Sequence, residues 1–102
     1  MSETLEFDDL DYLDGSDLRG VFEQMAPAEV VAALWGATPH LRGRLLRKLP
    51  RRLSSEIDRL LAATAHLTFD RVRIAQQQAI AVMCRLSRSG QIAFDVPEDL
   101  VA

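Results

Sequence analysis

The strongest constraint on this chain is the pattern of residues 30–61, VVAALWGATPHLRGRLLRKLPRRLSSEIDRLL, in which apolar side chains recur every three to four residues. Helix breakers divide this pattern into three parts. Gly36 is expected to close one helix in a left-handed conformation, and Thr38-Pro39 to start the next with a hydroxyl cap and a ring that presets φ. Pro50 disfavours helical geometry at the residue before it, so a third helix begins there. Short helices that are apolar on one side must pack against each other, so the pattern predicts a stack of helices.

The same periodicity and capping signals predict an all-α fold, a compact bundle or superhelix of about six helices. The expected helices cover residues 7–13, 16–25, 27–35, 39–48, 50–63 and 69–89. The expected core consists of apolar residues on the helical stripes: Leu18, Phe22, Leu34, Leu45, Leu53, Ile57, Val72, Ala79, Met83 and Leu86. Residues 91–96 alternate weakly and are expected to run extended over the helices. Residues 1–102 are expected to form one domain, with a core of about 5–94 and a tail of 95–102.

Composition narrows the class of protein. The chain has 102 residues, of which 48% are hydrophobic, and this is ordinary for a globular protein. No apolar run approaches the roughly 20 residues that span a bilayer, and the acidic start lacks the features of a secretory signal. The single cysteine, Cys84, has no partner for an internal disulfide, which favours a reducing, cytoplasmic location.

The net charge of −3 conceals a strong polarity along the chain. Residues 1–40 contain nine acidic residues and one basic residue, whereas residues 41–60 contain seven basic residues and two acidic ones. Such segregation indicates either that the two regions neutralise each other within the fold or that they form patches for partners of opposite charge.

The sequence offers little for catalysis. It contains no glycine-rich phosphate loop, and its two histidines, His40 and His66, lack the spacing of metal ligands. Cys84 falls near the apolar stripe of the last helix, where a small buried core residue is a better interpretation than a nucleophile. We therefore expect no enzymatic activity, no cofactor, no metal site and no small-molecule substrate.

The basic segment 42–52 favours an alternative function, nucleic-acid binding, because its arginines and lysine could contact phosphates. The chain as a whole is acidic, however, and no aromatic residue lies among these basic residues. The segment also lacks the polar side chains that read bases. Binding to protein is therefore the leading hypothesis and nucleic-acid binding the alternative.

Four side chains are candidates for contact with a protein partner. Arg52, Glu56 and Arg59 are spaced to form a ladder on one helix face, which is either a set of weak surface ion pairs or a contact surface. Trp35 shares an apolar stripe with Val31, which favours core packing. An exposed tryptophan at this place would instead be a good anchor for a partner.

Several short segments, taken in order, resemble the C-terminal domain of the flagellar motor switch protein FliG over about residues 5–94. The segments that carry the resemblance are Leu5-Glu6-Phe7-Asp8-Asp9-Leu10, Asp14 to Met25, Ala33-Leu34-Trp35-Gly36-Ala37, Leu41 to Arg52, Ala75-Gln76-Gln77 and Arg85-Leu86 through Gly90-Gln91-Ile92. The resemblance implies a compact helical domain at the outer rim of a rotor ring, where charged residues meet the stator.

The charge pattern of the family is only partly retained. By position, Arg52 matches a family arginine, but Trp35 stands where the family has lysine. Arg59 and Leu60 stand where the family has two aspartates, and residues 65–68 replace its Gly-Pro-Val-Arg turn. Most of the charges that the resemblance assigns to the stator-facing surface are therefore absent or inverted.

The sequence thus predicts a non-enzymatic protein-interaction domain in or near a flagellar motor, at the cytoplasmic face of the basal body. The expected partners are rotor or stator proteins, the membrane is approached at most peripherally, and self-association is left open. The N-terminal and middle domains of the family are missing from this sequence. The chain is therefore either an excised fragment or a small standalone relative.

Overall fold

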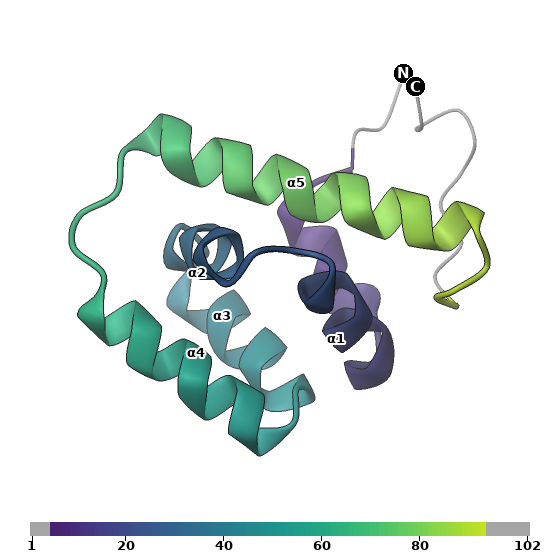
Figure 1. The fold of residues 1–102 in the computed structure, drawn as a ribbon, viewed down its shortest axis with the longest axis horizontal. Helices are drawn as coiled ribbons and strands as arrows, with labels where there is room; N and C mark the ends of the chain where they lie inside the picture. The colour runs from purple at the N-terminus through teal and green to yellow at the C-terminus, as the bar shows by residue number, and fades with distance from the viewer. Residues whose placement is uncertain (1–4, 94–102) are drawn as a thin grey trace.

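The computed structural model describes residues 5–93 and contains six helices in this range (Figure 1). They are the 3-10 helix η1, Phe7–Tyr12, and the α-helices α1, Gly15–Glu23, α2, Pro27–Trp35, α3, Pro39–Lys48, α4, Arg51–Ala63, and α5, Phe69–Arg88. No strand occurs in this range, so the all-α prediction is confirmed and the helix bounds agree to within two residues. Residues 91–93 bend and are not extended, which makes that prediction wrong there; its remainder and the predicted tail lie outside the described residues.

Three helix ends carry residues that typically cap helices, among them the predicted cap Thr38. Thr38 Oγ1 accepts a hydrogen bond from the Leu41 amide at 3.2 Å at the start of α3. Thr68 Oγ1 accepts one from the Arg71 amide at 3.1 Å at the start of α5. Gly90 follows α5 with a φ of +74°, a conformation that favours glycine because it has no Cβ. These helix ends are therefore set by local sequence.

Gly36 follows α2, but not in the predicted left-handed conformation, because its φ is −84°. Its role is steric. A Cβ at this position would lie 2.1 Å from Cγ1 of Val72 on α5, far closer than carbon atoms approach. The glycine therefore allows the end of α2 to pack closely against α5.

Helix α2 lies at the centre of the fold, with α5, the longest helix, packed across it (Figure 1). Residues 30–34 of α2 are all buried, so this helix is enclosed on most of its sides. α1 and η1 pack against α5 as well, and α3 packs against η1. α4 lies at an edge of the molecule, where it packs mainly on α2.

Most of the predicted core is confirmed. The buried members of that set are Leu18, Phe22, Leu34, Leu45, Ile57, Ala79, Met83 and Leu86. Leu53 and Val72 are half-buried, and Leu53 packs against the edge of the buried core. For Leu53 the reason is the position of α4, whose only buried residue is Ile57. An edge helix covers its apolar face only in part.

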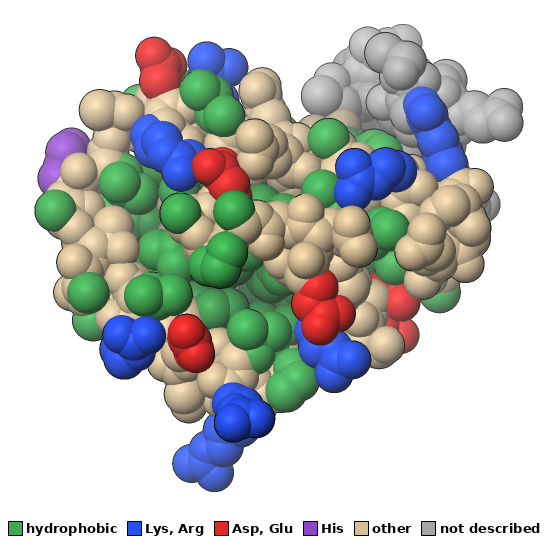
Figure 2. Space-filling model, viewed as in Figure 1, with side chains coloured by type: hydrophobic (Ala, Val, Ile, Leu, Met, Phe, Trp, Pro, Cys, Tyr) green, Lys and Arg blue, Asp and Glu red, His purple; other side chains and the backbone are tan. Residues whose placement is uncertain are grey.

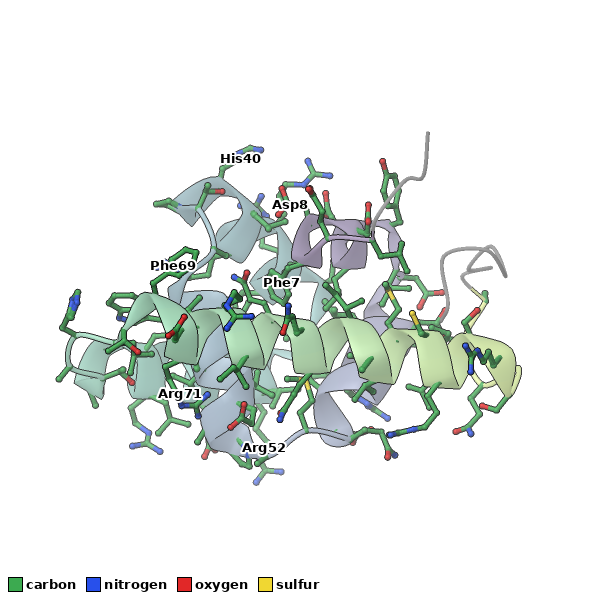
Figure 3. All side chains as sticks on the ribbon, turned by 90° about the horizontal axis from the view of Figure 1, so that it is seen from above. Phe7, Asp8, His40, Arg52, Phe69 and Arg71 are labelled. Carbon is green, nitrogen blue, oxygen red and sulfur yellow. The ribbon has the colours of Figure 1, made fainter. Side chains whose placement is uncertain are left out.

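A bidentate ion pair joins the two central helices. Arg71 on α5, labelled in Figure 3, donates from Nη1 and Nη2 to the two carboxylate oxygens of Glu29 on α2, at 3.1 and 2.8 Å. The planar guanidinium matches the carboxylate in this geometry, which makes such pairs stronger than single contacts. The ion pair therefore links α2 and α5 in addition to their apolar packing.

Candidate functional site

The predicted contact residues Arg52, Glu56 and Arg59 lie together on the exposed side of α4 and form the α4 ridge. Glu56 Oε1 is 3.6 Å from Arg59 Nη2, with side chains 62% and 69% exposed. Ion pairs this exposed contribute little to stability. Arg52 has no ion pair within residues 5–93, although the sequence suggested a ladder that includes it. All three charges therefore remain available to a partner.

Trp35 is the last residue of α2 and is half-buried, which is intermediate between the core packing and the exposed anchor that the sequence allowed. Its ring meets His66 edge to face, with ring centroids 5.6 Å apart. Trp35, His66 and Phe69, here named the aromatic corner, line a surface hollow of about 460 Å³. Phe69 is 81% exposed. Trp35 thus borders a surface hollow beside the exposed Phe69, and aromatic residues at such places commonly anchor partners.

Sequence analysis missed Phe69 as a surface residue. The spacing gave no signal, because Phe69 is the first residue of α5 and stands three residues before Val72 of the predicted stripe. In the view of Figure 3, Phe69 and Arg52 emerge on opposite sides of α5. The aromatic corner and the α4 ridge are therefore two separate surfaces.

Arg42, the first residue of the basic segment, is engaged inside the domain. Its Nε donates to the carbonyl oxygen of Leu34 at 2.9 Å, and its Nη2 donates to those of Trp35 at 3.2 Å and Ala37 at 3.1 Å. The last carbonyls of an α-helix lack partners in their own helix and carry partial negative charge. Arg42 therefore caps the C-terminus of α2.

Two further cations of this segment bind η1. Arg44 Nε donates to Asp11 Oδ2 at 2.8 Å, and Lys48 Nζ donates to the carbonyl oxygens of Asp11 and Leu13. Asp11 Oδ1 is buried and accepts no well-aligned hydrogen bond, so its contact with Lys48 Nζ at 3.1 Å is an ion pair. Burial raises the pKa of Asp11, but Lys48 and Arg44 outweigh it and the net pKa is lowered.

Three of the six cations in the basic segment 42–52, namely Arg42, Arg44 and Lys48, thus cap a helix or neutralise the acidic N-terminal region. Arg47, Arg51 and Arg52 remain exposed, and none of them has an ion pair within the described chain. The charge polarity of the sequence is therefore in part internal complementarity. Only three cations of the segment are left for an external partner.

Residues with catalytic chemistry are scattered. His40 and His66 are exposed, and no cluster of three potential metal ligands exists among the residues that the structure describes. Cys84 is half-buried, less than predicted, and burial raises the pKa of its thiol despite the nearby Arg88. A raised pKa keeps the sulfur in its less nucleophilic form.

No helix in the described range is long and apolar enough to cross a membrane.

The order and packing of these helices define a small all-helical domain of the flagellar motor switch type. The family model of the FliG C-terminal domain matches residues 1–94, and the chain belongs to this family. A crystal structure of FliG from H. pylori matches with a TM-score of 0.77 at 20% sequence identity. The match covers 87% of this chain and 39% of that one, and at this identity it shows a common fold. The comparison with curated proteins gives no significant match.

Proposed function

We propose that this domain is a non-enzymatic protein-interaction part of a flagellar motor switch complex, located at the cytoplasmic face of the basal body. Its partners are rotor or stator proteins, which it contacts through the α4 ridge. The observation that carries the proposal is the exposure of Arg52, Glu56 and Arg59 on a member of the FliG C-terminal domain family. Charges held only by weak contacts within their own domain lose little when they turn to a partner.

The size of the expected effect follows from Coulomb's law. Two opposite unit charges 4 Å apart attract by about 1 kcal/mol in water, and reversing one of them turns this into a similar repulsion. Reversal of Arg52 therefore changes the binding free energy by about 2 kcal/mol, which corresponds to about thirtyfold in Kd. Arg47, which is also exposed but lies on α3, offers a matched control.

The test is a pull-down of purified rotor and stator components by the wild-type domain and by Arg52→Glu, Arg59→Glu and Arg47→Glu, with titration of any retained partner. We expect one motor component to be retained, with weaker binding by the two ridge variants and unchanged binding by Arg47→Glu. The same proteins are passed over immobilised DNA in a salt series. Retention on DNA that is lost equally in Arg47→Glu and Arg52→Glu, without a motor partner, contradicts the proposal and supports the nucleic-acid alternative.

A graft into a working motor tests the altered charge pattern. Because Trp35, Arg59 and Leu60 differ from the residues that the resemblance implies, replacement of the corresponding FliG domain by this one should restore little or no swimming. Reversion of these three residues to Lys, Asp and Asp should improve the chimera, because the stator of the host motor faces the charges of its own FliG, whereas the pull-down concerns the partner of this chain. Thr68→Arg is better omitted, since Thr68 caps α5 by its bond to the Arg71 amide and its loss costs about 1 kcal/mol. Near-normal swimming with the unmodified graft would contradict this reasoning.

A further inference from the structure

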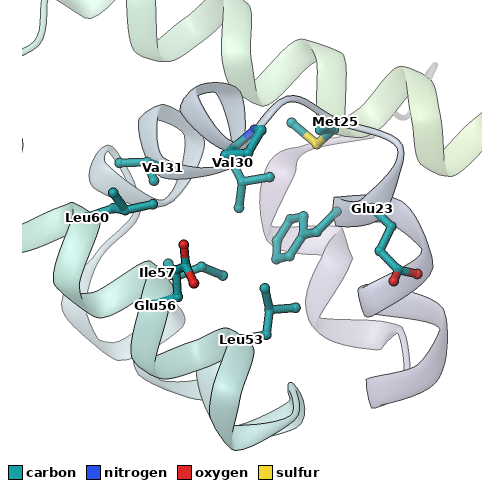
Figure 4. A pocket seen from close by; sticks show the side chains of 10 residues that line it. Glu23, Met25, Val30, Val31, Leu53, Glu56, Ile57 and Leu60 are labelled. Carbon is teal, nitrogen blue, oxygen red and sulfur yellow. The ribbon is translucent and has the colours of Figure 1, made fainter.

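A second surface lies beside the α4 ridge, where α1, α2 and α4 enclose a hollow of about 330 Å³ (Figure 4). Apolar side chains from all three helices line it, among them Phe22, Val30, Val31, Leu53, Ile57 and Leu60. Its volume is at the lower end of the range typical of binding pockets. The hollow is therefore large enough to take one or two apolar side chains of a partner.

This hollow continues along the domain. A second hollow of about 330 Å³ shares Pro27, Val31 and Leu60 with it and extends the apolar lining to Leu67. The two hollows together form the α2–α4 groove. In Figure 2, hydrophobic side chains gather in the depression between α5, along the top, and α4, along the lower left. An elongated depression that follows a helix suits a rod-shaped occupant better than a compact small molecule.

The inner face of α4 is not fully covered by its own domain. Ile57 is its only buried residue, whereas Leu53, Leu60 and Leu61 are half-buried. Contiguous apolar depressions bordered by polar residues mark sites of interaction. A common occupant of such a groove is an amphipathic helix that inserts apolar side chains spaced by one turn.

The charges at the groove select the kind of helix. Glu23 on α1 and Glu56 on α4 lie on opposite sides of the first hollow, as Figure 4 shows, and they are the only charged residues that line it. Glu23 is 3.8 Å from Arg19, in an ion pair as exposed and as weak as that of Glu56. In the second hollow the one charged residue, Arg71, is engaged by Glu29. The charges that line the groove and are held only by weak, exposed ion pairs are therefore negative.

We infer that the α2–α4 groove binds an amphipathic helix of a partner protein that carries lysine or arginine beside its apolar face. Two or three large apolar side chains at one-turn spacing enter the two hollows. The flanking cations lie against Glu23 and Glu56, which fixes the orientation of the helix. The groove shares Glu56 with the α4 ridge, but Arg52 and Arg59 do not line it, so variants at these two arginines distinguish this site from the charged contact proposed above.

A pair of labelled peptides of about 16 residues, long enough to populate a helix, provides the probe. Both carry leucine at i, i+4 and i+7, one with flanking lysines and the other with glutamates at the same positions. Fluorescence polarisation with the full chain should show that the lysine peptide binds at least tenfold more tightly. The double variant Glu23→Lys/Glu56→Lys should invert this preference. Equal affinity for both peptides, or no binding of either, overturns the inference.

Two further variants locate the binding. Leu60→Ser should lower the affinity for the lysine peptide at least tenfold, and circular dichroism should show that the helix content of the variant is unchanged. The double variant Arg52→Glu/Arg59→Glu should bind the lysine peptide at least as tightly as the wild type. Because this variant disrupts the α4 ridge, the two proposals can fail independently. Unchanged binding by Leu60→Ser places the peptide elsewhere and refutes the site. A wild-type dimer in sedimentation that Leu60→Ser dissociates shows that the occupant is a second copy of this chain.

Discussion

Replacement of Arg42 by alanine is the sharpest test of how this fold uses its basic residues. The variant loses three hydrogen bonds from one guanidinium to the end of α2, with donor–acceptor distances of 2.9, 3.2 and 3.1 Å. A hydrogen bond that involves a charged group contributes about 1.5–3 kcal/mol, and bonds from one partly buried group do not add fully. We therefore expect the free energy of unfolding to fall by about 2–4 kcal/mol. For a domain of this size, that lowers the Tm by about 10–20 °C.

Urea unfolding followed by circular dichroism measures this loss directly. Arg47→Ala is the matched control, because it removes the same charge from the same helix at an exposed position and should change stability by no more than about 0.5 kcal/mol. Arg42→Lys should recover only part of the stability, since an ammonium group cannot reach three carbonyls in a fixed fork. If Arg42→Ala and Arg47→Ala unfold at the same urea concentration, the capping role of Arg42 is refuted.

Three other predictions concern stability and are measured in the same way. Because the pKa of Asp11 is lowered in the folded state, the ionised Asp11 contributes its full stabilisation above the ordinary pKa of 3.8, and this is lost as the pH falls through the lower folded value. Asp11→Asn should therefore reduce the free energy of unfolding most near neutral pH and least in strong acid. A reduction that does not depend on pH contradicts this. Gly15→Ala should destabilise by about 1–3 kcal/mol, because its Cβ would lie 2.2 Å from the Lys48 carbonyl oxygen. Gly20→Ala, in the same helix with open space around it, should stabilise by about 0.5–1 kcal/mol, and equal effects at the two glycines would refute the steric argument. Leu86→Ala should cost about 2–5 kcal/mol and Leu53→Ala distinctly less, since only Leu86 is fully buried; equal costs would mean that α4 is more enclosed than the structure shows.

The sequence alone determined where the helices begin and end. Proline at the first helical position, a threonine cap such as Thr38 or Thr68, and Gly90 at a left-handed position act within one turn of the chain. The apolar stripe of each helix is likewise a local property, so most core residues were predictable from spacing. The order of these segments also indicated the family, because motifs in sequence order do not depend on the details of packing.

The roles of side chains at helix ends and at the edges of the domain depend on the tertiary structure. Periodicity shows which face of α4 is apolar, but not that this helix lies at an edge and leaves Leu53 half-buried. In the sequence Gly36 indicates the end of a helix, but glycine is required there because of the close approach of Val72, which lies 36 positions later in the chain on another helix. In the sequence Arg42 is one of several cations in a basic segment, and only the fold shows that its partners are carbonyl oxygens at the end of another helix. Burial and charge pairing depend on which distant segment lies opposite, and the local pattern of a sequence does not contain that information.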